Sequence, residues 1–528
     1  MLIDTFINSF ELFHNAPDSI QRLRSLILQL AVRGQLVEQE CSESRATQSS
    51  SSPQAPCGWS VVPLGTILEV QNGFAFKSAR FNTARVGMPL IRIRDIGNTK
   101  TEAYYDGDYR EEFIVDPGTL LIGMDGNFNI RRWQGPRALL NQRVCRLWRF
   151  RESTEPDFVL LSLQQYLDVI HKESKNYTTV KHLSSKQIKA IPLPLPPLAE
   201  QHRIVEKVDS LMKLCDELEE KQGEQKKVRV ALNKAALDSM LKAKSAPSFN
   251  RAWHRIRDNF DLLYDRPETV AELRQSILQL AVQGKLVPQD PNDEPASVLL
   301  ERIRAEKEQL IKDGQIKKQK PLPPIDPSEV PFDLPRGWEW VRMIESFDVR
   351  DGTHDTPKYV TEGYPLVTSK NLYTGYLDLS NVKYISEQDH LKIAERSFVE
   401  KGDVLFAMIG SIGNPVIVDT EPNFSIKNVA LFKYYNRRYS VPKYLRVYLA
   451  SCAEKMRTAS AGGVQSFVSL TFLRKYPFPL PPLREQHRIV EKVDSLMNLC
   501  DELEMKLRQS QTDSETLLTA MINSILEH

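Results

Sequence analysis

Apolar residues recur at alternating spacings of four and three positions after residue 200, a pattern typical of a coiled-coil seam. The seam residues, which we expect at an interface with another helix or with a partner, are Ile204, Val208, Leu211, Cys215 and Leu218. The same spacing returns near the C-terminus in Ile489, Val493, Leu496, Cys500 and Leu503. A helix over 200–244 would be roughly 65 Å long at about 1.5 Å per residue. The pattern therefore predicts two long helices.

Each long helix lies within a duplicated segment. PLPLPPLAEQHRIVEKVDSLMKLCDELE at 192–219 and PFPLPPLREQHRIVEKVDSLMNLCDELE at 477–504 differ at three of 28 positions. A shorter helical segment at 10–37, which contains LILQLAV, returns at 260–287. In the middle of the chain the long helix precedes the short one, whereas at the ends the short helix is first and the long helix last. This order predicts a circular arrangement with an approximate two-fold relation.

Short apolar runs bounded by glycine, proline and asparagine predict strand-rich domains between the helices. MPLIRIRDI in the first domain corresponds to YPLVTSKNL in the second, and each domain adds a helical pattern, at 157–171 and at 441–457. In MPLIRIRDI, Arg92 and Arg94 alternate with isoleucines, so a strand would turn both arginines away from the core. The prolines of PLPPL are expected to interrupt strand and helix and to form a stiff lead-in to each long helix.

The repeats and composition changes predict seven segments. They are an N-terminal helical segment that packs with the C-terminal helix (1–40), a serine-rich linker (41–56), a first strand-rich domain (57–197), a central helical region (198–290), a charged helix and Lys/Pro linker (291–334), a second strand-rich domain (335–482) and a C-terminal long helix (483–528). The charged segment is longer than the serine-rich linker that it replaces, so it breaks the symmetry of the chain.

Composition narrows the class of protein. The chain is 41% hydrophobic and 26% charged, which is typical of a globular protein. Its length of 528 residues predicts several structural units. None of the six cysteines has CxxC spacing and no histidine cluster completes a zinc site, which favours buried free thiols in a reducing cytosol. The N-terminus lacks a basic signal region and the apolar runs are too short to span a bilayer, so we expect a cytoplasmic protein.

The sequence lacks the common motifs of nucleotide-binding and catalytic sites. The sequence contains no GxxxxGK[ST], GxGxxG, HExxH or GxSxG motif. Asp125 near Asn127, and Asp351 near His354 and Asp355, are conceivable catalytic groups. They are better interpreted as turn residues beside glycine, because such residues are common in turns.

The net charge of the chain is only +2, so it does not by itself indicate a nucleic-acid partner, and local clusters of basic residues have to be considered instead. Residues 126–151 hold seven arginines, no acid and interleaved aromatic residues, and arginine binds phosphate and guanine while asparagine and glutamine pair with adenine. The alternative for this stretch is a solvated strand face. Both domains are modestly basic, with 19 Lys and Arg against 14 Asp and Glu in 57–197, and 19 against 15 in 335–482.

The candidate DNA-binding residues come from both domains. In the first they are Phe76, Lys77, Arg92, Arg94, Arg131, Arg132, Asn141, Gln142 and Arg143. In the second they are His354, Thr356, Lys358, Lys370, Asn371, Lys427 and Asn428.

This organisation resembles the specificity subunit of type I restriction–modification systems. The resemblance rests on GFAFKS at 73–78, on MPLIRIRDI, on VDPGTLLIGMDG from 115, and on the repeated PLPPLxEQxRIVxKVD. It implies an α+β chain: two strand-rich α/β target-recognition domains, separated by long conserved helices that form an antiparallel coiled coil with circular pseudo-two-fold symmetry. Each domain would read half of a bipartite DNA sequence, and the helices would set the spacing.

The same resemblance implies a non-catalytic chain that directs other subunits. Two modification (methyltransferase) subunits and restriction (translocase and nuclease) subunits would be its partners, with S-adenosylmethionine, ATP and Mg²⁺ bound by those partners and none by this chain. One alternative is a coiled-coil scaffold whose domains bind peptides. Another is a fused modification enzyme, which the missing motifs disfavour.

Overall fold

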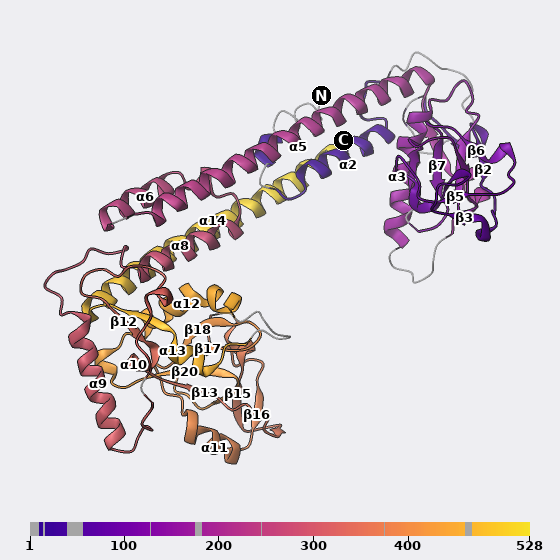
Figure 1. Cartoon of the computed structure of the whole chain (residues 1–528). Helices are drawn as coiled ribbons and strands as arrows, with labels where there is room; N and C mark the ends of the chain where they lie inside the picture. The colour runs from indigo at the N-terminus through magenta and orange to yellow at the C-terminus, as the bar shows by residue number, and fades with distance from the viewer. Residues whose placement is uncertain are drawn as a thin grey trace. The chain divides into compact units, whose positions relative to one another are not determined.

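The computed structural model describes residues 10–13, 16–39, 56, 58–126, 128–174, 182–243, 245–320, 322–373, 375–459 and 467–527 (Figure 1). The chain divides into two compact units, one of residues 1–225 with 511–528 and one of residues 226–510. Two long helices pass from one unit to the other, α5 (Leu198–Leu241) and α14 (Leu483–Glu527). The two predicted long helices are thus present.

The helical part of the first unit joins three helices. The short helix α2 (Ser19–Val32) packs against the beginning of α5 and the end of α14 in one apolar core. Arg24 binds Asp216 at 2.6 Å and Glu219 at 2.9 Å, and the Arg22 guanidinium donates to the Thr519 hydroxyl at 2.8 Å. The beginning of one long helix therefore shares a core with the end of the other, which is an antiparallel arrangement.

The second unit repeats this arrangement. The short helix α8 (Val270–Val282) shares a core with the end of α5 and the beginning of α14. Arg274 binds Asp501 at 2.7 Å and Glu504 at 3.0 Å, the counterparts of the Arg24 contacts at sequence offsets of 250 and 285. Two further helices, α6 (Ala246–Asp258) and α7 (Phe260–Leu263), lie between α5 and α8 in the sequence.

The predicted seam residues lie inside these cores. Of the ten, Leu218 and Leu503 are half-buried and the other eight are buried. Four cysteines are buried free thiols, as expected: Cys145, Cys215, Cys452 and Cys500. Cys41, Cys57, Asn127 and most of the serine-rich linker lie outside the described residues. Because of burial, the pKa of Cys500 is raised to about 11, which keeps its thiol neutral.

A proline-rich strand connects each domain to its long helix. β11 (Pro192–Leu195) pairs antiparallel with β1 (Ser60–Pro63), and β21 (Pro477–Leu480) pairs with β12 (Glu339–Arg342). The expectation that these prolines interrupt strands is therefore wrong. Each sheet has two strands, so every strand has a free edge, and proline is tolerated on an edge.

A tryptophan fixes the first turn of each long helix. The Trp59 indole donates to the Glu200 carboxylate at 2.9 Å, and the Trp338 indole donates to Glu485 at 2.9 Å. Both carboxylates are buried. Burial raises the pKa of Glu485, although Trp338 and Gln289 donate hydrogen bonds to it.

Besides the two-stranded sheet, the described part of the first domain contains two larger sheets. The four-stranded sheet has the order β2 (Glu69–Asn72), β10 (Val144–Trp148), β7 (Leu120–Gly123), β8 (Ile130–Arg132), all antiparallel. The five-stranded sheet has the order β3 (Phe81–Asn82), β5 (Tyr104–Tyr105), β4 (Met88–Ile91), β9 (Ala138–Leu140), β6 (Ile114–Val115). Its helices are α3 (Pro156–Ser174) and α4 (Ser185–Lys189).

The second domain has the same plan. One sheet has the order β13 (Phe347–Asp351), β20 (Val429–Tyr434), β17 (Val404–Ala407), β18 (Gly413–Ile417). The other has the order β14 (Tyr359–Val360), β16 (Lys383–Ile385), β15 (Tyr364–Val367), β19 (Ser425–Ile426). Its helices are α10 (Met343–Ser346), α11 (Glu387–Ser397), α12 (Pro442–Ala459) and α13 (Leu470–Lys475).

The charged segment that breaks the symmetry packs within the second unit. It contains α9 (Ala296–Lys312), and the Lys307 ammonium donates to the Ile344 carbonyl at 2.9 Å. In the linker that follows, Glu329 binds Arg342 at 2.5 Å, and this hydrogen bond lowers the pKa of Glu329 to about 2. The predicted domain boundaries themselves remain a prediction.

Candidate nucleic-acid interface

Two turns meet in the first domain where its two sheets adjoin. The turn after β2 (residues 73–78) contacts the turn after β9 (residues 141–143), and we call this contact the first junction. The Phe74 amide donates to the Leu140 carbonyl at 2.9 Å, and the Gln142 amide donates to the Phe74 carbonyl at 3.0 Å. The first junction therefore brings the turn of Phe76 and Lys77 to the turn of Asn141, Gln142 and Arg143, at least 64 positions away in the sequence. Phe76 and Asn141 are buried, so only Lys77, Gln142 and Arg143 of these candidates are exposed.

The second domain forms the same contact with different side chains. Residues 352–358 follow β13 and meet residues 426–428, which are the end of β19 and the turn after it, and we call this contact the second junction. The Thr353 amide donates to the Ile426 carbonyl at 3.0 Å, and the Asn428 amide donates to the Thr353 carbonyl at 3.2 Å. His354, Thr356 and Lys358 are thereby brought to Lys427 and Asn428.

A glycine allows the two backbones to approach in each junction. A Cβ atom on Gly73 would lie 2.1 Å from the Asn141 carbonyl oxygen, and one on Gly352 would lie 2.1 Å from the Ile426 oxygen. Neither distance is compatible with a side chain. The two glycines therefore have the same role, although the residues that follow them differ.

The first junction holds an arginine against a carboxylate. The Arg143 guanidinium lies 2.5 Å from one oxygen of Asp125, and His182 Nδ1 lies 2.8 Å from the other. Burial raises the pKa of Asp125, but the hydrogen bonds with His182 and Arg143 outweigh burial, so the pKa is below its usual value. The side chain of Arg143 is 58% exposed, so its remaining N–H groups face solvent. Such a group can bind phosphate or the acceptor atoms of guanine.

The second junction holds a histidine between a carboxylate and an amide. His354 Nε2 lies 2.8 Å from an Asp351 oxygen, and His354 Nδ1 lies 3.1 Å from Asn428 Oδ1. Asp351 is buried, and its other oxygen binds Arg396 of α11. The Lys427 ammonium donates to the Thr356 hydroxyl.

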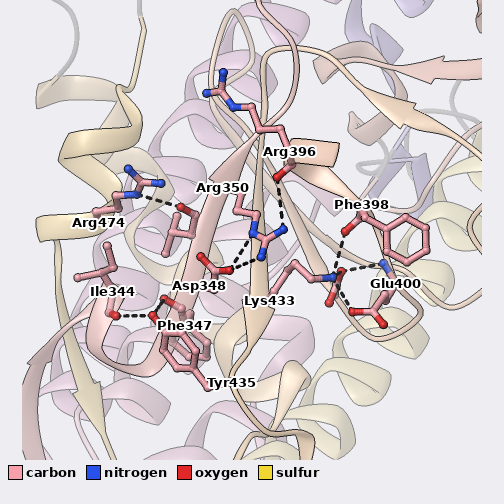
Figure 2. A network of polar contacts seen from close by, with 12 residues as sticks. Ile344, Phe347, Asp348, Arg350, Arg396, Phe398, Glu400, Lys433, Tyr435 and Arg474 are labelled. Carbon is pink, nitrogen blue, oxygen red and sulfur yellow. Dashed lines mark hydrogen bonds and ion pairs between the residues drawn. The ribbon is translucent and has the colours of Figure 1, made fainter. Parts of the chain in front are cut away.

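A polar network fixes the position of α11, the helix that carries Arg396 (Figure 2). The Arg350 guanidinium of β13 binds Asp348 and donates to the Arg396 carbonyl at 3.4 Å. Nearby, the Lys433 ammonium binds the carboxylates of Glu400 at 2.7 Å and Asp403 at 2.8 Å. Burial raises the pKa of Asp403, whereas the hydrogen bond from Lys433 lowers the pKa of Glu400.

A matched turn presents one cation in each domain. β4 ends at Ile91, and Ile93–Asp95 form a 3-10 helix, so the predicted strand alternation of Arg92 and Arg94 is wrong. The chain turns because the Asp95 carboxylate accepts the Arg92 amide at 2.8 Å. In the second domain Asn371 accepts the Thr368 amide at 2.9 Å in the same way. Arg94 and Lys370 are exposed at corresponding positions of the two turns.

The amide of Asn371 is used within the protein. It also donates to the carbonyls of Asp378 at 3.0 Å and Asn381 at 3.3 Å, and the residue is buried. Arg92 is half-buried and lies 3.4 Å from Asp95. These two candidates therefore stabilise the turns that expose Arg94 and Lys370, and a DNA contact by either remains a prediction.

The seven arginines of 126–151 do not form one surface. Arg146 is buried, binds Gln71 and donates to the carbonyls of Glu112 and Ile114, and burial lowers its pKa. Arg132 pairs with Asp157 at 2.6 Å, and Arg131 donates to Gln164 at 2.5 Å. The charge of this stretch is therefore divided among structural contacts and exposed groups.

Sequence reasoning missed the residues that position the candidates. The interpretation of Asp351 as a turn residue is wrong: it is the last residue of β13 and binds His354 and Arg396. Asp125 likewise binds two side chains. No local signal marks Arg396 or His182, because each reaches its carboxylate from a distant element. Tyr373, 71% exposed after the turn that carries Lys370, was also not identified.

Among the described residues, no group of three or more His, Cys, Asp or Glu side chains is arranged to hold a metal ion. None of the helices in the described part of the chain combines the length and apolarity that crossing a membrane requires.

Comparisons with known proteins indicate one family, whose model matches the chain in two segments. A model of the type I restriction modification DNA specificity domain matches residues 56–227 and 335–510. The chain is 29% identical to the type I restriction enzyme EcoAI specificity subunit of Escherichia coli, over 96% of this chain and 94% of that protein. It is also 29% identical to the EcoBI specificity subunit of Escherichia coli, over 86% of this chain and 82% of that protein. The crystal structure of the HsdS subunit from Thermoanaerobacter tengcongensis aligns with a TM-score of 0.44 and 18% identity, covering 90% of this chain and 97% of that chain.

The two matches of the family model together span more than half of the chain, and each contains one junction. The chain belongs to the type I restriction–modification DNA specificity family. Its fold is α+β, with two strand-rich domains separated by long helices, as the sequence predicted. Membership supports a DNA-reading subunit and does not support the peptide-binding scaffold.

Proposed function

We propose that each domain reads one half of a bipartite DNA sequence through its junction. The observation that carries this proposal is the repeated contact between two turns, which presents Gln142 and Arg143 in one domain and His354 and Asn428 in the other. A common backbone with different hydrogen-bonding groups suits two half-sites of different sequence, because base edges differ in their donors and acceptors. The modest positive charge of both domains supports attraction to phosphate.

The chain in this proposal directs catalysis that other subunits perform. Methyltransferase subunits would bind the repeated helical regions, and because the helical contacts occur twice, two copies can bind in equivalent ways. Restriction subunits would add cleavage. S-adenosylmethionine, ATP and Mg²⁺ would act on those partners, and the target adenine would leave the base stack in the methyltransferase. We expect the complex in the cytoplasm.

The long helices would set the spacer between the half-sites. Deleting Val208–Leu214 would remove buried residues of the first unit, so a cleaner change removes residues 220–226 of α5 together with 505–511 of α14, which are mostly exposed. Seven residues shorten a helix by about 10 Å, or about three base pairs. We expect a shorter spacer with unchanged half-sites. An unaltered spacer in a folded variant would contradict this role.

A pair of matched arginine variants tests DNA reading. Arg143→Ala removes the exposed arginine of the first junction, and Arg137→Ala removes an exposed arginine at the opposite end of β9, paired with Asp116 at 3.4 Å. With methyltransferase subunits present, we expect Arg143→Ala to weaken specific binding roughly tenfold or more and Arg137→Ala to change it little. Equal affinities of the two variants for the cognate duplex would contradict the assignment.

A further inference from the structure

The hydrogen bonds of His354 restrict its protonation. Its Nε2 faces the carboxylate of Asp351, which can only accept a hydrogen bond, so Nε2 carries a proton. Its Nδ1 faces the side-chain amide of Asn428 at 3.1 Å. The proton on Nδ1 is therefore the one that can be gained or lost. The Asn428 amide must offer an acceptor when Nδ1 is protonated and a donor when it is not.

The amide of Asn428 has one orientation for each state of His354. When the imidazole is protonated, Nδ1–H donates to Asn428 Oδ1, and the NH₂ group points away from the ring. When the imidazole is neutral, Nδ1 accepts, so the amide must turn its NH₂ group toward the ring and its oxygen away. In the described part of the chain, the Asn428 side chain makes no hydrogen bond apart from the one with His354.

The backbone holds Asn428 in place while its amide turns. Asn428 has a φ of 54°, a left-handed conformation that asparagine adopts more readily than most residues. Its amide N–H donates to the Thr353 carbonyl at 3.2 Å, so the residue is anchored to the turn that carries His354. Rotation of the terminal amide requires no movement of this anchor.

The charges around His354 come from β13, from α11, from the turn after β19 and from its own turn. Asp351 contacts the ring from β13, and Arg396 of α11 binds the other oxygen of that carboxylate. Lys427 precedes Asn428 and binds Thr356, while Asp355 and Lys358 are exposed in the same turn as His354. The His354 side chain is 49% exposed, so protons exchange with solvent.

We propose that His354 is a positioning residue whose protonation decides which atom of the Asn428 amide faces DNA. This inference rests on the proposed function of the second junction. With His354 protonated, Asn428 offers N–H donors, which match the acceptors of guanine and thymine. With His354 neutral, Asn428 offers an oxygen acceptor, which matches the amino groups of adenine and cytosine.

Selection of DNA at two pH values tests the inference. The full chain with its methyltransferase subunits would select duplexes from a library with both half-sites randomised, at pH 5.5 and at pH 8.5. These values span the range in which histidine changes charge. At one position of one half-site, the selected duplexes carry either A or C, or else G or T. We expect the ratio of the first pair of bases to the second to rise roughly five- to tenfold between pH 5.5 and pH 8.5. The same ratio at both pH values would overturn the proposal.

Two variants separate the histidine from other titrating groups. His354→Gln removes the titrating ring, so the ratio should not depend on pH. Asn428→Asp presents an oxygen acceptor in every state, so the preference for A or C should persist at pH 5.5. A pH-dependent ratio that survives in His354→Gln would overturn the proposal.

The other half-site is an internal control. Gln142 occupies the position that corresponds to Asn428, and among the described residues no imidazole forms a hydrogen bond with its side chain. Base preferences in that half-site should not change with pH. Sequence-specific selection without the pH effect would refute the inference alone, whereas the absence of any sequence preference would contradict the proposed function as well.

Discussion

The two junctions share a backbone and differ in what they hold. The first fixes an arginine on Asp125, and the second fixes a histidine between Asp351 and Asn428. Gly73 and Gly352 make the same close approach in both. The difference shows that glycines and strand register fix the position of the turns, while the carboxylates select which side chain is presented.

Two corresponding strands of the domains differ in the same manner. In the second domain, Lys433 of β20 pairs with Asp403 and Glu400. The corresponding residue of β10 is Trp148, and Arg146 and Arg149 lie 3.9 Å and 4.2 Å from the centre of its ring system. The second domain thus has an ion pair where the first has arginines stacked on a tryptophan, on corresponding strands of corresponding sheets.

The largest expected effect follows from breaking the ion pair of the second domain. Lys433→Met would leave the nearly inaccessible carboxylate of Asp403 without its cation, which costs about 3–5 kcal/mol for a buried pair. We expect faster hydrogen exchange in β17 and β20 and unchanged exchange in the first domain. The double variant Lys433→Met with Asp403→Leu should recover much of the loss. Equal destabilisation by the double variant would argue against an unpaired charge as the cause.

The next effect concerns the shared glycines. Gly73→Ala and Gly352→Ala should each destabilise their own domain by about 3 kcal/mol, because the added Cβ would overlap a carbonyl oxygen. Gly223→Ala is the control, since a Cβ there meets no atom within 4 Å. In the middle of α5 it should stabilise by up to about 1 kcal/mol. Hydrogen exchange resolved by domain measures all three, and tolerance of alanine at both junctions would contradict the common backbone.

The smallest effect compares the two tryptophans. Trp59→Phe removes the one side-chain hydrogen bond described for buried Glu200 and should cost about 2 kcal/mol. Trp338→Phe should cost about 1 kcal/mol, because Gln289 still donates to Glu485 at 2.8 Å. Hydrogen exchange at the start of α5 and of α14 measures the two losses. A larger loss at α14 would show that Gln289 does not compensate.

The repeats and periodic patterns predicted the helices well because both depend on local spacing. The seam residues from Ile204 to Leu218 lie inside a core, and α3 and α12 cover the predicted helical segments. Candidate residues from both turns of each junction were also identified, although nothing in the sequence showed that the turns meet. Their meeting depends on strand pairing, which is not a local property.

Errors occurred where distant residues decide the outcome. The basic stretch considered for DNA contact includes Arg146, but the side chain of Arg146 is buried and binds Gln71 of a neighbouring strand. The strand through Arg94 ends early because Asp95 caps a turn. Arg396 and His182 escaped notice because their partners, Asp351 and Asp125, lie far away in the sequence.

The central claim is that the two junctions read separate halves of one target. The most direct measurement maps methylated adenines in cells that carry the whole system with Gln142→Ala and Arg143→Ala, and separately with Asn428→Ala. We predict that the first variant relaxes one half of the methylated motif and the second variant relaxes the other half, with the spacer unchanged. Changes in both halves from either variant, or in neither half from both, would contradict the claim.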